Sequence, residues 1–203
     1  MDMRKLKERL GFRAKVQDPK SVKKQSFIYE AGETLLVAFV LAMILRTFVV
    51  QAFYIPSSSM EDTLLINDML LANKFIYYFT DPKRGDIVIF RNQEGGQPGA
   101  DKEYIIKRVI GTPGDRLKIK DGEVYVNDAK IEEPYIKEKC RYDIVLMPTQ
   151  ALEATVPADS VFVMGDNRNN SRDSRFFGFL PRPAIVGKAL VRYWPLTRLG
   201  PVY

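Results

Sequence analysis

The 203-residue sequence contains no histidine and a single cysteine, Cys140. One cysteine excludes an intrachain disulfide, and without histidine a structural zinc site of the usual Cys/His type is not expected. The missing imidazole also constrains serine chemistry, because a serine nucleophile is ordinarily activated by a histidine base. A serine hydrolase built from this chain needs another base. Lysine suits that role, because burial readily makes its amine neutral.

Positive charge is concentrated before Glu30, although the whole chain carries a formal net charge of only +6. The basic residues of this part include Arg4, Lys5, Lys7, Arg9, Arg13, Lys15, Lys20, Lys23 and Lys24. Such a stretch is typical of segments that meet either nucleic acid or an anionic membrane. Here an apolar stretch follows it, so we expect a lipid bilayer as partner and no nucleic acid.

The longest apolar stretch runs from Leu35 to Ile55. A helix of that length rises roughly 30 Å, enough to cross a bilayer. Arg46 opposes insertion by about 3 kcal/mol, whereas the thirteen Leu, Ile, Phe and Val residues of the stretch together favour it by roughly 4–8 kcal/mol. Insertion is therefore favoured, with Arg46 paired or reaching toward the interface.

Three interpretations of this stretch are open: a buried core helix, a cleaved signal peptide with Leu35–Leu45 as its apolar region, or a retained anchor. If the stretch is a cleaved signal peptide, the cleavage site would lie near Val50–Ala52. The retained anchor is favoured because the preceding region is long and an arginine follows the apolar run. We then expect a single-pass protein of the cytoplasmic membrane, with residues 1–30 cytoplasmic, 31–55 in the membrane and 56–203 forming an extracytoplasmic catalytic domain.

After Met60 the sequence predicts a mainly β fold. Short β-rich runs are bounded by Pro, Gly and Asp residues, as strands are. They are Met69–Leu71, Asp86–Arg91, Tyr104–Ile110, Arg116–Lys120, Glu123–Asn127, Ser160–Met164 and Gly187–Trp194. Lys120–Glu123 reads as a hairpin turn, and Gln93–Ala100 as an exposed loop. The charged segment of residues 117–159 is expected to be a small inserted β subdomain.

Three motifs carry the chemistry. Pro56–Leu64 (P-S-S-S-M-E-D-T-L) follows the apolar stretch, Tyr104–Asp115 (Y-I-I-K-R-V-I-G-T-P-G-D) puts Lys107 into an apolar strand, and Gly165–Arg175 (G-D-N-R-N-N-S-R-D-S-R) is a polar loop after a strand. Each has a simple structural interpretation by itself: a serine-rich linker, a solvent-facing lysine, and a tight connecting loop. A lysine inside an apolar strand is costly unless its amine is paired or neutral, although a solvent-facing lysine beside Arg108 is the simpler interpretation of that motif alone.

Taken in this order behind an apolar segment, the motifs resemble those of bacterial type I signal peptidases, also called leader peptidases. The resemblance runs from the apolar segment to Trp194 and is weak across residues 117–159. It implies Ser59 as nucleophile, Lys107 as general base, and the hydroxyl of Ser57 with the backbone N–H of Ser59 as the oxyanion hole. It also implies that Ser171 orients the lysine while Asp173 and Arg175 support the site.

Two positions depart from the family pattern: Ser58 stands where glycine is common, and Glu61-Asp62 precedes Thr63, where some members have proline. Neither carries a reacting atom.

Tyr104 and Ile105, just before the base, are weak candidates for substrate binding. The implied substrate is an exported preprotein with small residues at positions −1 and −3 before the cut. No metal or organic cofactor is expected.

Apolar neighbours Ile105, Ile106, Val109 and Ile110 are expected to desolvate Lys107 and lower its pKa. The aromatic run Phe75–Phe79 is interpreted either as core or as a surface that rests on lipid. Two rivals stay open: another Ser/Lys protease of the self-cleaving repressor type, and an inactive membrane-anchored binding module that keeps the fold.

Overall fold

The computed structural model describes residues 19–44, 46, 49–91 and 104–203. The chain divides into two units, Met1–Ile44 and Leu45–Tyr203, which are taken here one at a time. The predicted exposed loop Gln93–Ala100 and most of the basic N-terminal segment lie outside the described residues.

The described part of the first unit is a single helix, α2 (Pro19–Ile44). Proline suits the first turn of a helix, because it has no N–H to be left unpaired. Apolar side chains from Leu35 to Met43 are exposed around the helix. Across the described residues, the length and apolarity needed to cross a bilayer are not found together in any helix.

The prediction of one continuous helix to Ile55 is wrong at its C-terminal end. Val50–Tyr54 forms a strand, β1, paired antiparallel with β2 (Met69–Asn73) from Val50↔Asn73 to Tyr54↔Met69. A run of β-branched and aromatic residues suits a strand as well as a membrane helix. Burial decides between them: Phe53 and Ile55 enter the core of the second unit, which therefore begins at Leu45 and not at residue 56.

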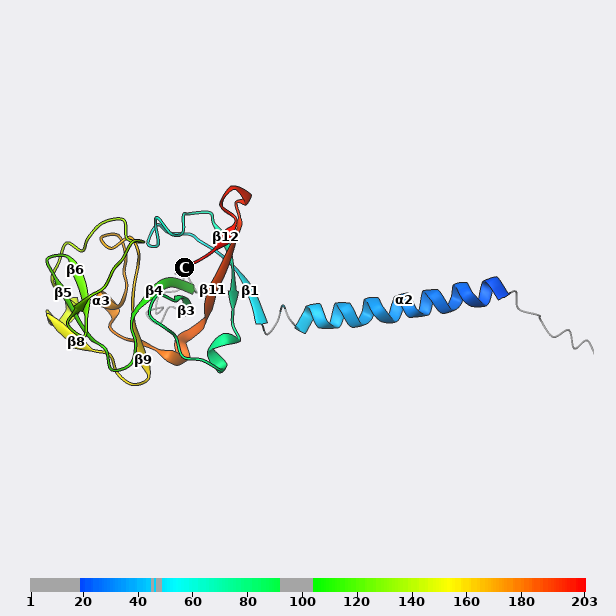
Figure 1. Ribbon diagram of the computed structural model, residues 1–203, viewed down its shortest axis with the longest axis horizontal. Coiled ribbons are helices and arrows are strands. Elements are labelled where there is room, and N and C mark those ends of the chain that lie inside the picture. The colour runs from blue at the N-terminus through cyan, green and yellow to red at the C-terminus, as the bar shows by residue number, and fades with distance from the viewer. Residues whose placement is uncertain (1–18, 45, 47–48, 92–103) are drawn as a thin grey trace, which may run out of the picture. The chain divides into compact units, whose positions relative to one another are not determined.

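In the described residues, the second unit consists of two antiparallel sheets (Figure 1). The larger has the order β1-β2-β11-β3-β4-β9-β10, and β12 pairs with β11. Its further strands are β3 (Ile87–Arg91), β4 (Tyr104–Gly111), β9 (Ser160–Met164), β10 (Leu180–Pro181), β11 (Ile185–Trp194) and β12 (Gly200–Pro201). The mainly β prediction is confirmed, and each predicted strand of this sheet is present.

The smaller sheet has the order β7-β6-β5-β8 and contains β5 (Arg116–Lys120), β6 (Glu123–Val126), β7 (Ala129–Lys130) and β8 (Glu153–Thr155). It occupies the segment predicted as an inserted subdomain. Asp121 and Gly122 turn the β5–β6 hairpin with φ of 53° and 74°, the left-handed conformation that an Asp-Gly turn provides.

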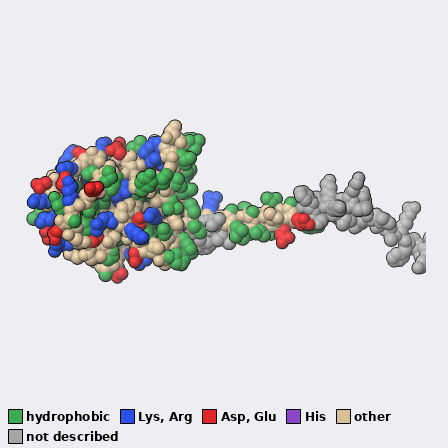
Figure 2. Space-filling view, viewed as in Figure 1, with side chains coloured by type: hydrophobic (Ala, Val, Ile, Leu, Met, Phe, Trp, Pro, Cys, Tyr) green, Lys and Arg blue, Asp and Glu red, His purple; other side chains and the backbone are tan. Residues whose placement is uncertain are grey.

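Helices are short in this unit. They are α3 (Ser174–Phe177) and the 3-10 turns η2 (Ile76–Tyr78), η3 (Met147–Thr149), η4 (Arg182–Ala184) and η5 (Leu196–Arg198). Hydrophobic side chains also gather on the outside of the unit, along the edge where Figure 1 labels β1, β11 and β12 (Figure 2).

Candidate active site

The three consecutive serines lie in the connection between β1 and β2. Ile55 and Met60, on either side of them, are almost completely buried in the main core. The loop Gly165–Arg175 holds the serines from across the cleft, because Asn167 donates its backbone N–H to the Ser59 carbonyl (3.1 Å) and its side-chain amide to the Ser58 carbonyl (3.1 Å). The buried residues on either side and the hydrogen bonds from Asn167 fix the position of the serines.

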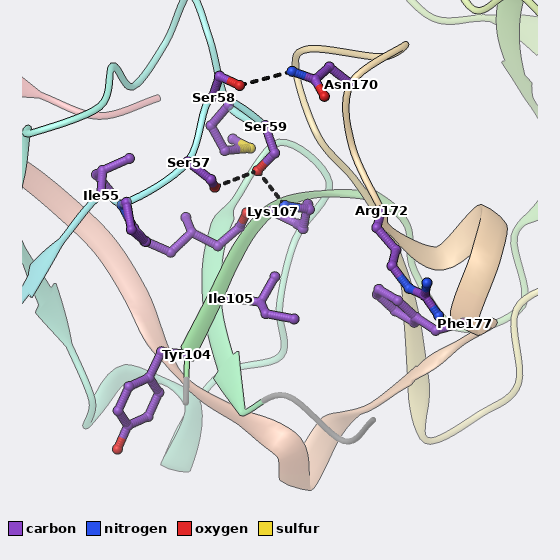
Figure 3. A pocket seen from close by; sticks show the side chains of 13 residues that line it. Ile55, Ser57, Ser58, Ser59, Tyr104, Ile105, Lys107, Asn170, Arg172 and Phe177 are labelled. Atoms are coloured by element: carbon purple, nitrogen blue, oxygen red, sulfur yellow. Dashed lines mark hydrogen bonds between the residues drawn. The ribbon is translucent and has the colours of Figure 1, made fainter. Parts of the chain in front are cut away.

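Lys107 lies in the middle of β4, opposite Val88 of β3. Its side chain is only 3% exposed. Its Nζ atom lies 2.6 Å from Ser59 Oγ and 3.0 Å from the Ile106 carbonyl oxygen (Figure 3). The structure thus brings together two residues 48 positions apart in sequence, at the distance that proton transfer between them requires.

The Ser57 hydroxyl lies 3.4 Å from Ser59 Oγ and points into the same cavity. This cavity has a volume of about 340 Å³. It is lined by Ile55, Pro56, Ser57, Ser58, Ser59, Met60, Tyr104, Ile105, Ile106, Lys107, Asn170, Arg172 and Phe177. None of these described lining residues is acidic. The cavity is mainly apolar, and the Ser57 hydroxyl and the Lys107 amine converge at Ser59, as polar groups do in many ligand sites.

Both weak candidates for substrate binding, Tyr104 and Ile105, line this cavity. Ile105 extends into it in Figure 3, whereas the Tyr104 ring points away from the serines and packs edge-on against Phe53 at 5.2 Å. Residues Tyr104–Lys107 pair with β3, and pairing of β4 with β9 begins only at Arg108. In the described residues, the other edge of β4 therefore has no paired strand at Tyr104–Lys107, beside the cavity.

The third motif forms a buried charged support behind the serines. Arg175 donates two hydrogen bonds of 2.8 Å to the Asp173 carboxylate and one of 2.6 Å to the Arg168 carbonyl. Asp173 also accepts from the Gly165 N–H at 3.0 Å. Burial raises the pKa of Asp173, but the Arg175 guanidinium and the Gly165 N–H lower that pKa by a larger amount. The net shift is downward. Asp173 is therefore ionised, and the pair makes the loop rigid.

The Ser171 hydroxyl is buried and helps to lower the pKa of Asp173, although in the described residues no partner atom meets its Oγ with good hydrogen-bond geometry. Its role in orienting Lys107 stays a prediction. A Cβ atom on Gly165 would lie 2.2 Å from Ser171 Oγ and 2.4 Å from the Ser59 carbonyl oxygen. Only glycine allows this approach, so Gly165 sets how closely the loop packs on the nucleophile segment.

Sequence analysis did not single out Gly165, Asn167 or Asn170. Asn170 donates its side-chain amide to Ser58 Oγ at 2.9 Å, linking the two walls of the cavity (Figure 3). These residues belong to the third motif, so the sequence did mark the segment that contains them. Their partners lie more than a hundred positions earlier, however, and local sequence does not indicate them.

The face of β4 opposite Lys107 carries another buried cation, Arg108. It donates to both oxygens of Asp166, at 2.8 and 2.7 Å, and its guanidinium carbon lies 3.8 Å from the centre of the Tyr135 ring. This arrangement is a paired structural cation stacked on an aromatic ring.

Within the described residues, no three His, Cys, Asp or Glu side chains are grouped so that they could hold a metal ion. The residues of the cavity place a serine hydroxyl beside a buried amine, at 2.6 Å. Amide, hydroxyl and backbone donors surround the pair.

Comparison with known proteins identifies the family of this chain. A family model described as signal peptidase, peptidase S26, matches residues 28–194. A probable signal peptidase I-2 of Synechocystis sp. is 44% identical over 171 residues, covering 84% of this chain and 75% of that protein. A signal peptidase I of Leptolyngbya laminosa is 45% identical over 180 residues, covering 88% and 85%.

Among solved structures, a signal peptidase I from Enterococcus faecalis is 32% identical with a TM-score of 0.43, covering 54% of this chain and 97% of that chain. The family model alone spans most of the chain, including all three motifs. This chain therefore belongs to the signal peptidase family, peptidase S26.

Proposed function

We propose that this chain removes N-terminal signal peptides from exported preproteins, with Ser59 as nucleophile and Lys107 as general base. The observation that carries the proposal is the 2.6 Å approach of Lys107 Nζ to Ser59 Oγ in a mainly apolar cavity. Family membership supports the same activity, that of a serine endopeptidase.

Acylation follows from this geometry. Lys107 takes the proton of the Ser59 hydroxyl, and Oγ attacks the scissile carbonyl carbon. The developing oxyanion would accept hydrogen bonds from the Ser59 N–H and the Ser57 hydroxyl, which already lies beside Ser59 Oγ. The Lys107 ammonium then gives its proton to the leaving amine, which departs as the new N-terminus and leaves an acyl-enzyme on Ser59.

Lys107 has to be neutral before each turnover. Its burial supports this, because the side chain is only 3% exposed. Burial disfavours the charged form of an amine. In deacylation, the neutral amine activates a water that hydrolyses the ester and regenerates the Ser59 hydroxyl.

We further propose that the signal peptide binds in extended form along the edge of β4 at Tyr104–Ile106, where described strands leave the backbone unpaired. Added-strand binding uses main-chain hydrogen bonds for affinity and side-chain pockets for specificity. The cavity of about 340 Å³ would then receive small residues at −1 and −3, with Ile105 on its wall.

The apolar stretch would hold the protein in the cytoplasmic membrane, with the basic N-terminus inside and the catalytic unit outside. The exposed apolar side chains of α2 from Leu35 to Met43 support this proposal, since a helix that is apolar all round suits lipid. A protease added to one side of sealed vesicles tests it. Residues 56–203 should be cut only from the extracytoplasmic side.

A serine comparison tests the catalytic proposal. Ser59→Ala should abolish preprotein cleavage, whereas the matched variant Ser58→Ala, one residue away in the same cavity, should lower it only severalfold. Equal cleavage by the two variants would contradict the proposal. No cleavage by the unaltered chain would favour an inactive binding module. Cleavage confined to the chain itself would favour a self-cleaving protease of the repressor type.

A further inference from the structure

The Asn167 side chain is aimed at one peptide group, the one that joins Ser58 to Ser59. Its Nδ2 atom lies 3.1 Å from the Ser58 carbonyl oxygen. In a trans peptide such as this one, the carbonyl of Ser58 and the N–H of Ser59 belong to one planar group and point in opposite directions. A hydrogen bond to the carbonyl therefore also fixes the direction of the Ser59 N–H, which is the backbone donor of the proposed oxyanion hole.

Two acceptors determine how the Asn167 amide is turned. Its Nδ2 atom also lies 3.3 Å from Glu61 Oε2, and that oxygen accepts a second hydrogen bond from Lys137 Nζ at 3.0 Å. A carboxylate and a carbonyl only accept hydrogen bonds, so both need the nitrogen of the amide and neither suits its oxygen. Glu61, at one of the two departures from the family pattern, thus keeps the donor side of Asn167 facing the Ser58 carbonyl.

The backbone of Asn167 is held independently of its side chain. Its N–H donates to the Ser59 carbonyl at 3.1 Å. Asp166 and Arg168, the residues on either side, are almost completely buried, and each forms a buried ion pair. A shorter side chain at position 167 should therefore leave the loop in place and remove only the hydrogen bonds of the amide.

We infer that Asn167 is a positioning residue for the oxyanion hole, and that Glu61 and Lys137 position it in turn. The inference rests on the proposed function, because that proposal gives the Ser59 N–H the task of binding the oxyanion. The hydrogen bond to the Ser58 carbonyl also polarises the peptide group, which makes the Ser59 N–H a stronger donor. Both effects act mainly in the transition state, where negative charge develops on the substrate oxygen.

The kinetic test compares two asparagines of the same loop. Asn167→Ala should lower kcat for preprotein cleavage about 10–100-fold with little change in KM, less than the loss of a whole oxyanion donor. Asn169→Ala is the matched control, because Asn169 donates to the Lys139 carbonyl at 2.9 Å and not to a serine. It should leave kcat unchanged. A normal kcat in Asn167→Ala, or a loss confined to KM, overturns the inference.

A second series tests the part assigned to Glu61. Glu61→Gln keeps a side-chain oxygen that can accept from Asn167 and should retain most of the activity, whereas Glu61→Ala should lower kcat severalfold. Combined with Asn167→Ala, Glu61→Ala should cause no further loss, because the link through which it acts is already gone. A further loss of the same size would show that Glu61 acts by another route and would contradict its positioning role.

A spectroscopic measurement tests the same link without catalysis. Serine follows serine only at Ser57–Ser58 and Ser58–Ser59, so the detergent-solubilised full chain labelled with carbonyl-¹³C, ¹⁵N serine should give two signals when each N–H is correlated with the preceding carbonyl. Ser57→Ala removes one signal and so assigns both. Asn167→Ala should shift the Ser59 signal, and Asn169→Ala should not. An unmoved Ser59 signal overturns the inference. Cleavage by Ser59→Ala would instead contradict the proposed function and does not alter this readout, so the two failures are distinguishable.

Discussion

Lys107 and Arg108 are neighbours on β4, and both are basic and buried, yet their surroundings are opposite. Lys107 is 3% exposed and faces the Ser59 hydroxyl in a cavity whose described lining includes no acid. Arg108 is 2% exposed and forms a two-bond pair with Asp166. Successive side chains of a strand point to opposite faces of the sheet, so one residue step separates the two environments.

Under the proposed mechanism, one strand carries both a structural cation and a reactive amine. Arg108 stays charged, because guanidinium is protonated in proteins and its carboxylate partner is present. A buried lysine loses its proton more readily, since burial penalises the ammonium. The proposed reactivity therefore depends on which face of β4 each side chain occupies, and the Asp166 carboxylate lies on the Arg108 side.

Methionine in place of Lys107 and, in a separate variant, of Arg108 should give the sharpest contrast between activity and stability. Lys107→Met should lower kcat about 10⁴-fold or more, because it removes the base, and should change the free energy of unfolding by only about 1 kcal/mol. Preprotein cleavage under single-turnover conditions and urea unfolding of the detergent-solubilised chain measure the two quantities. Cleavage by Lys107→Met at the normal rate would rule out the lysine as base.

Arg108→Met should show the reverse pattern. It leaves Asp166 buried without its partner, so the free energy of unfolding should fall by about 3–5 kcal/mol. The molecules that remain folded should cleave at a rate much closer to that of the unaltered chain. Arg108→Met combined with Asp166→Leu should recover part of the lost stability, because no uncompensated charge remains. Loss of activity without loss of stability would contradict the comparison.

On the Lys107 face, the Ser57 hydroxyl should matter for rate alone. Ser57→Ala removes one proposed oxyanion donor and should lower kcat about 10²–10³-fold with little change in KM. Ser57→Thr retains a hydroxyl and should restore a large part of the activity. A pure KM effect in Ser57→Ala would instead assign Ser57 to substrate binding.

The smallest expected effect concerns the link between Ser58 and Asn170. Asn170→Ala removes the 2.9 Å hydrogen bond across the cavity, which should cost about 1 kcal/mol and lower kcat/KM severalfold. If the bond acts only through Ser58, then Ser58→Gly should give the same loss and the double variant no further loss. Additive losses would show that the two side chains act separately.

Much of this site was predictable from residue order. The three motifs indicated Ser59, Lys107 and the Gly165–Arg175 loop, and β-rich runs bounded by Pro, Gly and Asp indicated β3, β4 and β9. Whether Val50–Tyr54 forms a helix or a strand was not predictable, because a continuous apolar run has no periodicity that distinguishes the two. The pairing of this segment with β2 makes it a strand.

Long-range contacts also escaped prediction. The close approach of Gly165 to Ser59 and the amide bonds from Asn167 and Asn170 depend on how the third motif packs against the first. A polar loop of Asn, Ser and Asp forms many local turns equally well, so its sequence does not specify which carbonyls and hydroxyls it meets. Tertiary packing supplies that information.

The pH dependence of kcat/KM, measured together with circular dichroism, tests the central claim that Lys107 acts as a neutral base. The folded-state pKa of Asp173 is lowered, so its contribution to stability is complete above the unfolded value of about 3.9 and is lost only below it. The fold should therefore be intact from about pH 5 to pH 8. Over that range kcat/KM should fall as pH falls, with a midpoint well below about 10.4, the ordinary value for lysine. A rate that stays constant down to about pH 5 with the fold intact would contradict the claim.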